Sequence, residues 1–401
     1  MIRLTLGNKF NVDVVPLFES VSDLENAGNI MDKVYSNKLY REHIIRRGNV
    51  QTVMLGFSDG TKDGGYLTAN WSILKAKESL TKVSRKFGIK VIFFDGRGGP
   101  PARGGGNTHQ FYSSLGDFIE SDEIQLTVQG QTISSNFGTI KSSQYNMEQL
   151  ISSGIKNRIL SNSEVFNKKN RKTIEKLSSI SYSSYKDFKS HPSFIPYLEK
   201  MSTIKYYSKT NIGSRPSKRG VKGEAFNFDK LRAIPFVGSW NQLKQNVPGF
   251  YGLGTSINHF YKNNKIKDVK LLYEEVPFFR ALVSNSMMSL TKSFFELTSY
   301  MSKDEEFGEF WKIIHDEYIL TKKMLLKISN FKELMENEPA NKLSIQTREN
   351  VVMPLITIQQ YALQIVKEIE SGEIDDKRIS VYEKIITRSL YGNINASRNS
   401  A

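Results

Sequence analysis

The sequence contains no cysteine among its 401 residues, and this absence excludes several classes of protein at once. Disulfide scaffolds, thiolate zinc sites, iron–sulfur clusters and cysteine nucleophiles all require the thiol. Long apolar runs are also missing. No stretch approaches the ~20 apolar residues of a membrane span, and the opening residues lack the apolar core of a signal peptide. We therefore expect a soluble, cytoplasmic protein with no membrane partner.

Histidine is scarce, with five residues in the whole chain, and none of them forms a metal-binding pattern. There is no His-Glu-x-x-His motif, which argues against zinc hydrolysis. The sequence also lacks a Gly-x-Ser-x-Gly nucleophile elbow, a Walker phosphate loop and a Rossmann Gly-x-Gly-x-x-Gly fingerprint. These absences argue against the best-known hydrolase and nucleotide-binding motifs.

What the sequence does have is an excess of positive charge. Lysine and arginine number 56 against 41 acidic residues, which gives a net charge of +15. The rest of the composition is ordinary for a globular protein, with 39% hydrophobic and 24% charged residues. Such a balance attracts anions of many kinds, including nucleic acid, anionic lipid and small phosphates or carboxylates.

The first third of the chain has a pattern typical of a parallel α/β fold. Apolar residues recur at helical spacing over residues 71–87, and Gly88 follows where a helix would end. Short apolar runs before and after this segment predict strands that are covered on both faces. The expected strands are residues 12–18, 53–57, 90–94 and, as a fourth candidate, 126–128.

The remainder of the chain, residues 141–401, is mainly helical in pattern and includes an Arg-rich segment at 212–235. We find no internal repeat and no long linker, so residues 1–140 and 141–401 are expected to form one unit. The fold class is therefore α/β and predominantly helical. Three or four parallel strands are too few for a closed barrel, which predicts part of a (β/α)₈ TIM-type barrel.

Each of the first three expected strands ends in charged or glycine-rich residues, namely Glu19, residues 58–65 and residues 95–106. Loops that follow the carboxyl ends of parallel strands gather on one face of the sheet, where active sites are built. The sequence therefore predicts one shared site formed by three separated segments.

The 95–106 loop holds Arg97 and Arg103 among six glycines. Glycine lets backbone N–H groups approach an oxyanion, and arginine donates paired hydrogen bonds to phosphate or carboxylate. An ordered anion site is predicted, with a flexible surface loop or an RGG-like RNA-binding segment as alternatives. Glu19 and Asp59 could hold a hard divalent cation, although helix capping and surface charge are the simpler interpretation of two carboxylates alone.

Five ordered motifs resemble those of phosphoenolpyruvate carboxylase of the bacterial type. They are residues 16–27, 56–63, 96–105, 213–219 with 231–235, and 397–400. The resemblance spans the whole chain but corresponds to only the C-terminal half of a family member, which would account for the incomplete barrel.

The resemblance implies a specific reaction. The family adds bicarbonate to phosphoenolpyruvate with Mg²⁺ or Mn²⁺, and it releases oxaloacetate for the tricarboxylic acid cycle together with phosphate. Carboxyphosphate and the enolate of pyruvate are the intermediates of this carbon dioxide fixation. The family enzyme is a tetramer built on a mostly helical (β/α)₈ barrel, so the partners implied are the N-terminal half and further copies of the chain.

The resemblance also implies roles for individual residues. By motif position, Glu19 and Asp59 match the metal ligands, which favours the cation interpretation of these carboxylates. The remaining matches are Arg97 and Arg232 for the phosphate of phosphoenolpyruvate, Arg103 as the mobile-loop arginine that stabilises carboxyphosphate, and Arg215 and Lys62 as active-site residues of less defined role.

Feedback inhibition by aspartate or malate is a further implication. By position, the inhibitor site consists of Lys292, Arg348 and Asn399, with Arg103 shared between the two sites. The inhibitor would then hold Arg103 away from the substrate and so couple the sites. From the residues alone, Lys292 and Arg348 are ordinary helix-surface charges.

Two departures from the family pattern affect these expectations. Asp95 stands where many members have histidine before Gly-Arg-Gly-Gly, so the role of that position is open. The essential histidine of the family's N-terminal His-Pro-Thr motif has no counterpart, and residues 191–193 share only two of its letters. We therefore expect the chain alone not to carboxylate. A basic nucleic-acid-binding protein and a non-catalytic, aspartate-binding regulatory remnant are the alternatives.

Overall fold

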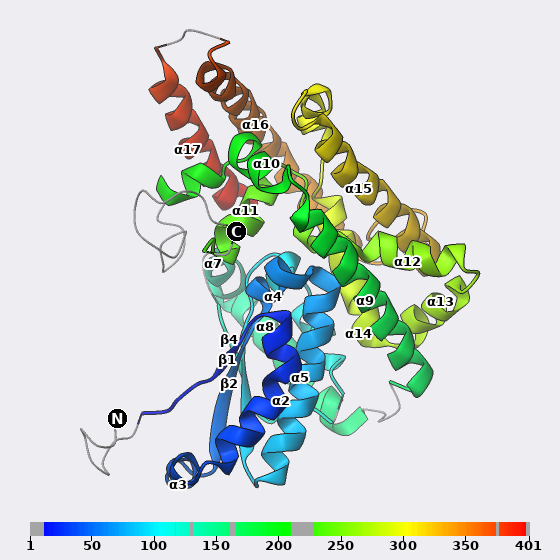
Figure 1. Ribbon diagram of the computed structural model, residues 1–401. Helices are drawn as coiled ribbons and strands as arrows, with labels where there is room; N and C mark the ends of the chain where they lie inside the picture. Colours follow the sequence, from blue (N-terminus) through cyan, green and yellow to red (C-terminus); the bar gives the residue numbers. More distant parts are fainter. Residues whose placement is uncertain are drawn as a thin grey trace.

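The structure is a computed structural model that describes residues 12–116, 118–128, 131–160, 166–209, 228, 230–373 and 377–397. Within this part of the chain the fold is predominantly helical, with one small sheet (Figure 1). Two predicted site residues, Arg215 and Asn399, lie outside the described residues, as does most of the 212–235 segment.

The sheet has four parallel strands in chain order, with β1 at one edge and β4 at the other. Met54 in the second strand aligns with Leu17 on one side and with Phe94 on the other. The strands are β1 (Leu17–Phe18), β2 (Val50–Gly56), β3 (Lys90–Gly96) and β4 (Ile124–Leu126). The α/β class is therefore confirmed, but the described strands form an open sheet, and the expected partial barrel stays a prediction.

The first expected strand is shorter than predicted. Only two residues of 12–18 pair with β2, and the Met54 N–H adds a bond to the Pro16 carbonyl at 2.8 Å. Val12, Val14 and Val15 are about half exposed, because described elements flank only one side of this edge strand.

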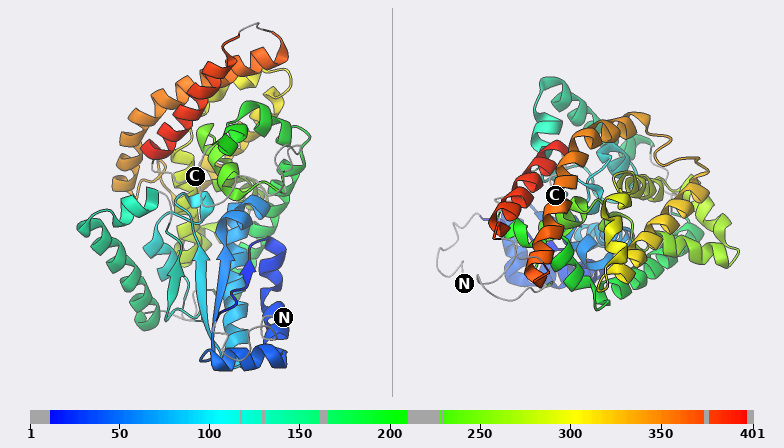
Figure 2. Two further views of the ribbon diagram at one scale, coloured as in Figure 1. Left: turned by 90° about the vertical axis from the view of Figure 1, so that its left-hand side faces the viewer. Right: turned by 90° about the horizontal axis from the view of Figure 1, so that it is seen from above.

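One face of the sheet is covered by α5, which packs against α2 and β3. Val53 and Leu55 on this face are fully buried, whereas Thr52, Met54 and Phe94 on the opposite face are only partly buried. In the left view of Figure 2 that second face is turned to the viewer and carries no helix of the described chain. Described helices thus cover one face of the sheet, and the expectation that the strands are covered on both faces stays a prediction.

The described helices account for most of the chain. Their bounds are α2 (Val21–Ser36), α3 (Lys38–Arg46), α4 (Phe57–Gly64), α5 (Tyr66–Lys86), α6 (Thr108–Ser113), α7 (Gln131–Phe137), α8 (Ile140–Leu160), α9 (Lys168–Ser190), α10 (Phe194–Met201), α11 (Ala233–Gln242), α12 (Leu253–Lys262), α13 (Ile266–Glu275), α14 (Pro277–Thr291), α15 (Gly308–Ser329), α16 (Pro339–Ser371) and α17 (Ile379–Ser397). Short 3₁₀ turns are η2 (Pro101–Arg103), η3 (Ile204–Lys209), η4 (Val247–Gly249) and η5 (Phe295–Lys303). Helix α5 ends two residues before Gly88, whose φ of +63° agrees with the predicted stop.

Most buried apolar residues belong to one continuous core that runs from Phe18 to Ile345 and so joins the strand-rich and helical segments. A second, smaller core forms where the α16–α17 hairpin packs against η3 and buries Tyr207, Leu363 and Ile386. No helix in the described part of the chain is both long and apolar enough to cross a membrane.

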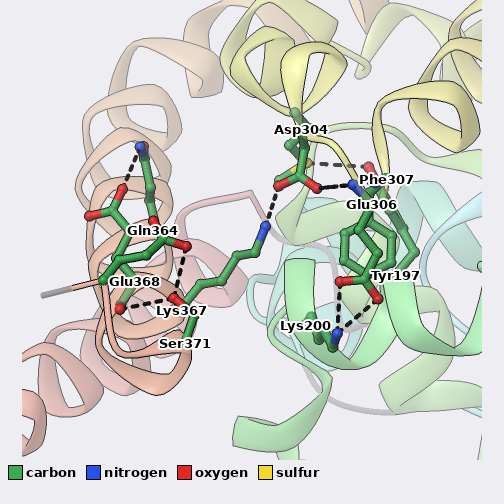
Figure 3. A network of polar contacts seen from close by, with 11 residues as sticks. Tyr197, Lys200, Asp304, Glu306, Phe307, Gln364, Lys367, Glu368 and Ser371 are labelled. Atoms are coloured by element: carbon green, nitrogen blue, oxygen red, sulfur yellow. Dashed lines mark hydrogen bonds and ion pairs between the residues drawn. The ribbon is translucent and has the colours of Figure 1, made fainter.

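Ion pairs connect α10, η5 and α16 across a cleft of about 960 Å³ (Figure 3). Lys200 binds Glu306 at 2.7 Å, and Lys367 of α16 pairs with Asp304. Asp304 also accepts hydrogen bonds from the N–H groups of Glu306 and Phe307, each at 3.0 Å, just before α15 begins. These contacts tie the α16–α17 hairpin to the main body.

Replacing Asp304 with asparagine is expected to lower the free energy of unfolding at pH 7 by about 1 kcal/mol, because a charge-assisted bond to Lys367 is lost. Burial raises the pKa of Asp304, but Lys367 and the backbone donors outweigh it and hold the pKa below 3.8. The stabilisation is thus present above pH 4 and disappears as the pH falls through the lowered pKa. Urea unfolding should show a smaller difference in free energy between the wild type and the variant at pH 3 than at pH 7. Asp32→Asn serves as a control, because it removes one partner of a surface ion pair with Lys86.

Candidate active site at the strand ends

Glu19 directly follows β1 and lies against the start of α4. A Cβ on Gly56 would stand 2.6 Å from Glu19 Cβ, and one on Gly60 would stand 3.2 Å from the Glu19 carbonyl oxygen. Glycine at these two positions lets the β1 turn approach the helix that carries Asp59. The two predicted metal ligands are therefore on adjoining segments.

Residues 58–65 were expected as a loop, but residues 58–64 belong to helix α4, which directly follows β2, and Gly65 is its C-cap. The helix places partly buried Asp59 in its first turn, where the helix dipole favours a negative charge. The glycines that suggested a loop instead permit close packing, because a Cβ on Gly64 would collide with Val21 Cγ2 at 2.5 Å.

The Gly-rich segment after β3 is folded back on itself. The N–H of Gly98 bonds the Arg103 carbonyl at 2.6 Å, and Gly105 N–H bonds the Pro100 carbonyl at 3.0 Å. Arg97 is 5% exposed, and its guanidinium donates to the carbonyls of Gly104 and Gly105. In this conformation Arg97 therefore binds the loop that follows it.

Arg103 is only 3% exposed and points toward α4. Its Nε donates to Ser58 Oγ at 3.3 Å, and its side chain crosses Gly98, where a Cβ would stand 2.8 Å from Arg103 Cβ. Burial lowers the pKa of Arg103 to about 10, and the nearby Asp59 carboxylate opposes that shift. The guanidinium remains charged at neutral pH next to the predicted metal ligand.

Lys62 connects α4 to the start of α11. Its ammonium donates to the carbonyls of Phe228 and Leu231 at 2.8 and 2.7 Å and lies 4.5 Å from the centre of the Phe228 ring. Arg232 is the next residue and forms the N-cap of α11, which contacts both α4 and η2. Lys62 thus holds the backbone that carries Arg232 beside the Asp59 helix.

If the chain binds phosphoenolpyruvate, as the sequence resemblance implies, the Lys62→Met variant is expected to weaken that binding at least tenfold, because two hydrogen bonds from a charged donor are worth about 1.5–3 kcal/mol each. Titration calorimetry of the purified chain measures this. Lys75→Met, which removes a more exposed ammonium bound to Glu175, is the matched control. An unchanged dissociation constant for Lys62→Met would show that this lysine neither binds the ligand nor positions Arg232.

A second cavity, of about 330 Å³, lies on the far side of the Gly-rich loop. Lys292 and Arg348 line it together with Gly99, Gly106 and His109, and no acidic side chain is among its described lining residues. Burial and the nearby charges of Lys244 and Arg348 lower the pKa of Lys292 to about 8. Lys292 and Arg348, which from the residues alone were ordinary helix-surface charges, therefore line one cavity together.

Lys244 contacts both of the segments that carry Lys292 and Arg348. Its backbone has a φ of +54°, and its carbonyl accepts the N–H of Phe294 at 2.8 Å, two residues after Lys292. Its buried ammonium binds both oxygens of Glu349, at 2.7 and 2.6 Å, next to Arg348. No sequence motif pointed to Lys244, because its partners lie 50 and 105 residues away.

Arg103 was expected to belong to both sites. In the structure its side chain bonds Ser58, whereas Gly99 and Gly106 of the same loop line the second cavity. The loop thus separates the two sites, and the shared role of Arg103 stays a prediction.

Glu19 and Asp59 alone would not complete the coordination shell of a hard cation, which would need further oxygen ligands from water or substrate. No group of three or more acidic or histidine side chains is arranged for a metal within the described ranges. Mg²⁺ is commonly held by one or two carboxylates, with water and substrate phosphate oxygens completing the shell, so the metal role of Glu19 and Asp59 stays a prediction.

Fold and site together define a parallel α/β protein with carboxylates and buried guanidinium groups at the carboxyl edge of its sheet. Comparison with protein families identifies the group: residues 3–396 match phosphoenolpyruvate carboxylase. The chain therefore belongs to the phosphoenolpyruvate carboxylase family, as the motifs predicted.

Proposed function

We propose that this chain carries the metal- and phosphate-binding portion of an enzyme that carboxylates phosphoenolpyruvate with bicarbonate to give oxaloacetate and phosphate. Family membership supports this reaction in general. The observation that carries the proposal is the placement of Glu19, Asp59, Arg103 and the Lys62–Leu231 contact around one end of a parallel sheet.

The proposed roles follow from charge. Phosphoenolpyruvate and bicarbonate are both anions, and guanidinium groups offset their repulsion and stabilise the transferring phosphoryl group. Arg97 and Arg232 would bind the phosphate, and Arg103 would neutralise carboxyphosphate. Glu19 and Asp59 would hold a Mg²⁺ or Mn²⁺ ion, which would supply Lewis-acid stabilisation of developing negative charge. Arg215 completes the proposed phosphate contacts.

Burial of the Gly-rich loop suits a reaction whose intermediates would react with water. Arg103 and Ala102 are 3% and 6% exposed, and they lie between α4 and the loop backbone. A closed Gly-rich loop excludes the water that would hydrolyse carboxyphosphate or protonate the enolate. For Arg97 to reach a substrate phosphate, its bonds to Gly104 and Gly105 must be exchanged, so we propose that the loop rearranges on binding.

Further protein is required to complete the barrel in this proposal. In the described part of the chain no further strand pairs with β1 or β4, and one face of the sheet has no helix cover. Helix α8 lies beside the β4 edge in the left view of Figure 2. Several large apolar side chains of this helix are exposed. These are Ile140, Met147, Ile151, Ile155 and Ile159, each more than half exposed. Such surfaces support a complementary N-terminal half that closes a (β/α)₈ barrel, and assembly as a tetramer.

A coupled assay for oxaloacetate tests the proposal on the purified chain. With Mg²⁺, bicarbonate and phosphoenolpyruvate, we expect metal-dependent substrate binding but no turnover until the complementary half is added. Rapid turnover by the chain alone would contradict the expectation that this chain does not carboxylate without the family's N-terminal histidine. Absence of any phosphoenolpyruvate binding with Mg²⁺ or Mn²⁺ would contradict the proposed function itself.

The second cavity favours one additional function, the binding of a regulatory dicarboxylate such as aspartate or malate. Lys292 and Arg348 line it, and none of its described lining residues is acidic. We propose that Asn399 joins this site. If the chain were a regulatory remnant, it would bind aspartate but not phosphoenolpyruvate, and this pair of titrations distinguishes the two possibilities.

A further inference from the structure

A buried ion pair lies beneath the Gly-rich loop. Lys77 of α5 and Asp95 of β3 are 2% and 0% exposed, and Lys77 Nζ is 2.7 Å from Asp95 Oδ2. Tyr112 of α6 donates its hydroxyl hydrogen to the same oxygen at 2.6 Å. Asp95 has the same parity as Val91 and Phe93 along β3, so it faces α5 rather than the open face of the sheet.

Burying such an ion pair in a core costs free energy. Removing two charges from water carries a desolvation cost of several kcal/mol per ion, and apolar residues of similar volume often stabilise a core equally well. The second carboxylate oxygen, Asp95 Oδ1, has no hydrogen-bond partner among the described residues. Simple core stability therefore does not account for the arrangement.

The pair is connected to Arg97 through Tyr112. The guanidinium carbon of Arg97 lies 5.2 Å from the centre of the Tyr112 ring and 4.5 Å from that of Phe111. Lys77 Nζ lies 5.6 Å from the same Tyr112 ring. Asp95 thus supplies the negative charge between two buried cations, and without it Lys77 and Arg97 would repel each other in a medium of low dielectric constant.

Arg97 in turn holds the loop. Its guanidinium donates to the carbonyls of Gly104 and Gly105, the two residues that follow Arg103. The order of contacts is therefore Lys77, Asp95, Tyr112, Arg97 and then the backbone next to Arg103.

We propose that Lys77, Asp95 and Tyr112 are positioning residues that fix Arg97 and, through Arg97, the Gly-rich loop that carries Arg103. Asp95 then acts from beneath the loop and does not contact the substrate. The effect on loop order depends only on contacts within this chain, whereas the effect on substrate affinity rests on the proposed function.

Tyr112→Phe is the mildest test, because it removes one hydroxyl and keeps the ring against Arg97. We expect hydrogen exchange in residues 96–106 to accelerate about tenfold, while exchange in α15 is unchanged. The affinity for phosphoenolpyruvate with Mg²⁺ should fall about tenfold, in the range found when an outer-shell partner of a functional group is removed. Tyr35→Phe is the matched control, since Tyr35 is another buried tyrosine whose hydroxyl bonds Ser84 Oγ at 3.2 Å.

Asp95→Asn separates positioning from simple electrostatics. Removal of a negative charge near Arg97 would strengthen anion binding if charge alone mattered, whereas a positioning role predicts weaker binding and a less protected loop. The double variant Lys77→Met with Asp95→Asn removes both charges and provides a folded comparison if Asp95→Asn alone is unstable.

The outcomes are distinct. Loop exchange at the wild-type rate in Tyr112→Phe and in the double variant would overturn the proposal, as would tighter phosphoenolpyruvate binding by Asp95→Asn. Faster loop exchange in a chain whose wild type binds no phosphoenolpyruvate would support the positioning role while contradicting the proposed function.

Discussion

Substitution of Asp59 by asparagine is expected to abolish Mg²⁺-dependent binding of phosphoenolpyruvate by this chain, with a loss of at least about 100-fold in affinity. A divalent cation contributes several kcal/mol of charge stabilisation at a phosphoryl site, and the amide introduced by Asp59→Asn would supply only a neutral oxygen. The change would also remove the carboxylate that faces buried Arg103. Calorimetric titration with phosphoenolpyruvate at fixed Mg²⁺, and with Mg²⁺ alone, measures both effects.

The control for this experiment is Asp32→Asn, because Asp32 pairs with Lys86 on the surface and is remote from the strand ends. Its affinity should equal that of the wild type. Glu19→Gln should reproduce the Asp59 result, since the two carboxylates are proposed to hold one ion. Normal metal-dependent binding in both variants would remove the metal assignment and leave the arginines as an anion site alone.

Substitution of Arg348 by alanine is expected to weaken binding of aspartate or malate by about 100-fold or more, because it removes a charged donor from a cavity whose described lining residues include no acid. Arg85→Ala, which removes an exposed guanidinium bound to Glu120, is the matched control. Retained aspartate affinity in Arg348→Ala would place the regulatory site elsewhere.

Aspartate binding should also depend on pH through Lys292. Burial, with Lys244 and Arg348, lowers the pKa of Lys292 to about 8, and only the protonated ammonium attracts a dicarboxylate. Affinity is therefore full below this pKa and declines as the pH rises through 8. In Arg348→Ala the pKa of Lys292 should move upward, because one neighbouring positive charge is gone. Titrations between pH 6.5 and 9.5 would contradict this reasoning if the affinity did not change.

Local sequence patterns predicted the elements that carry the site. The apolar run at 90–94 lies within β3, and the run at 53–57 lies in β2 except for Phe57, which begins α4. The helical repeat that ends near Gly88 is α5. Residues 58–65 were predicted wrongly as a loop because three glycines and two aspartates resemble turn chemistry. The structure uses those glycines for close packing against Glu19 and Val21, a requirement that depends on neighbours distant in sequence.

The burial of the loop arginines, which the sequence alone does not show, distinguishes nucleic-acid binding from the enzyme proposal. Nucleic-acid binding would require exposed basic groups, yet Arg97 and Arg103 are almost completely buried. A small anion that enters when the loop rearranges suits these side chains better than a duplex surface. This reasoning supports the enzyme proposal over the RGG-like interpretation of the loop.

The sequence by itself identified the family through its ordered motifs. It also showed that the chain has no thiol, few histidines and a net positive charge. Such features are local, because composition, periodicity and spacing are properties of a linear chain. Only the tertiary structure decided which charges face one another. In the fold Asp95 pairs with Lys77, Lys292 and Arg348 line the same cavity, and Lys244 binds Glu349 next to Arg348. These pairings depend on how strands and helices pack over long separations, and the free energy of a buried charge is set by that packing alone.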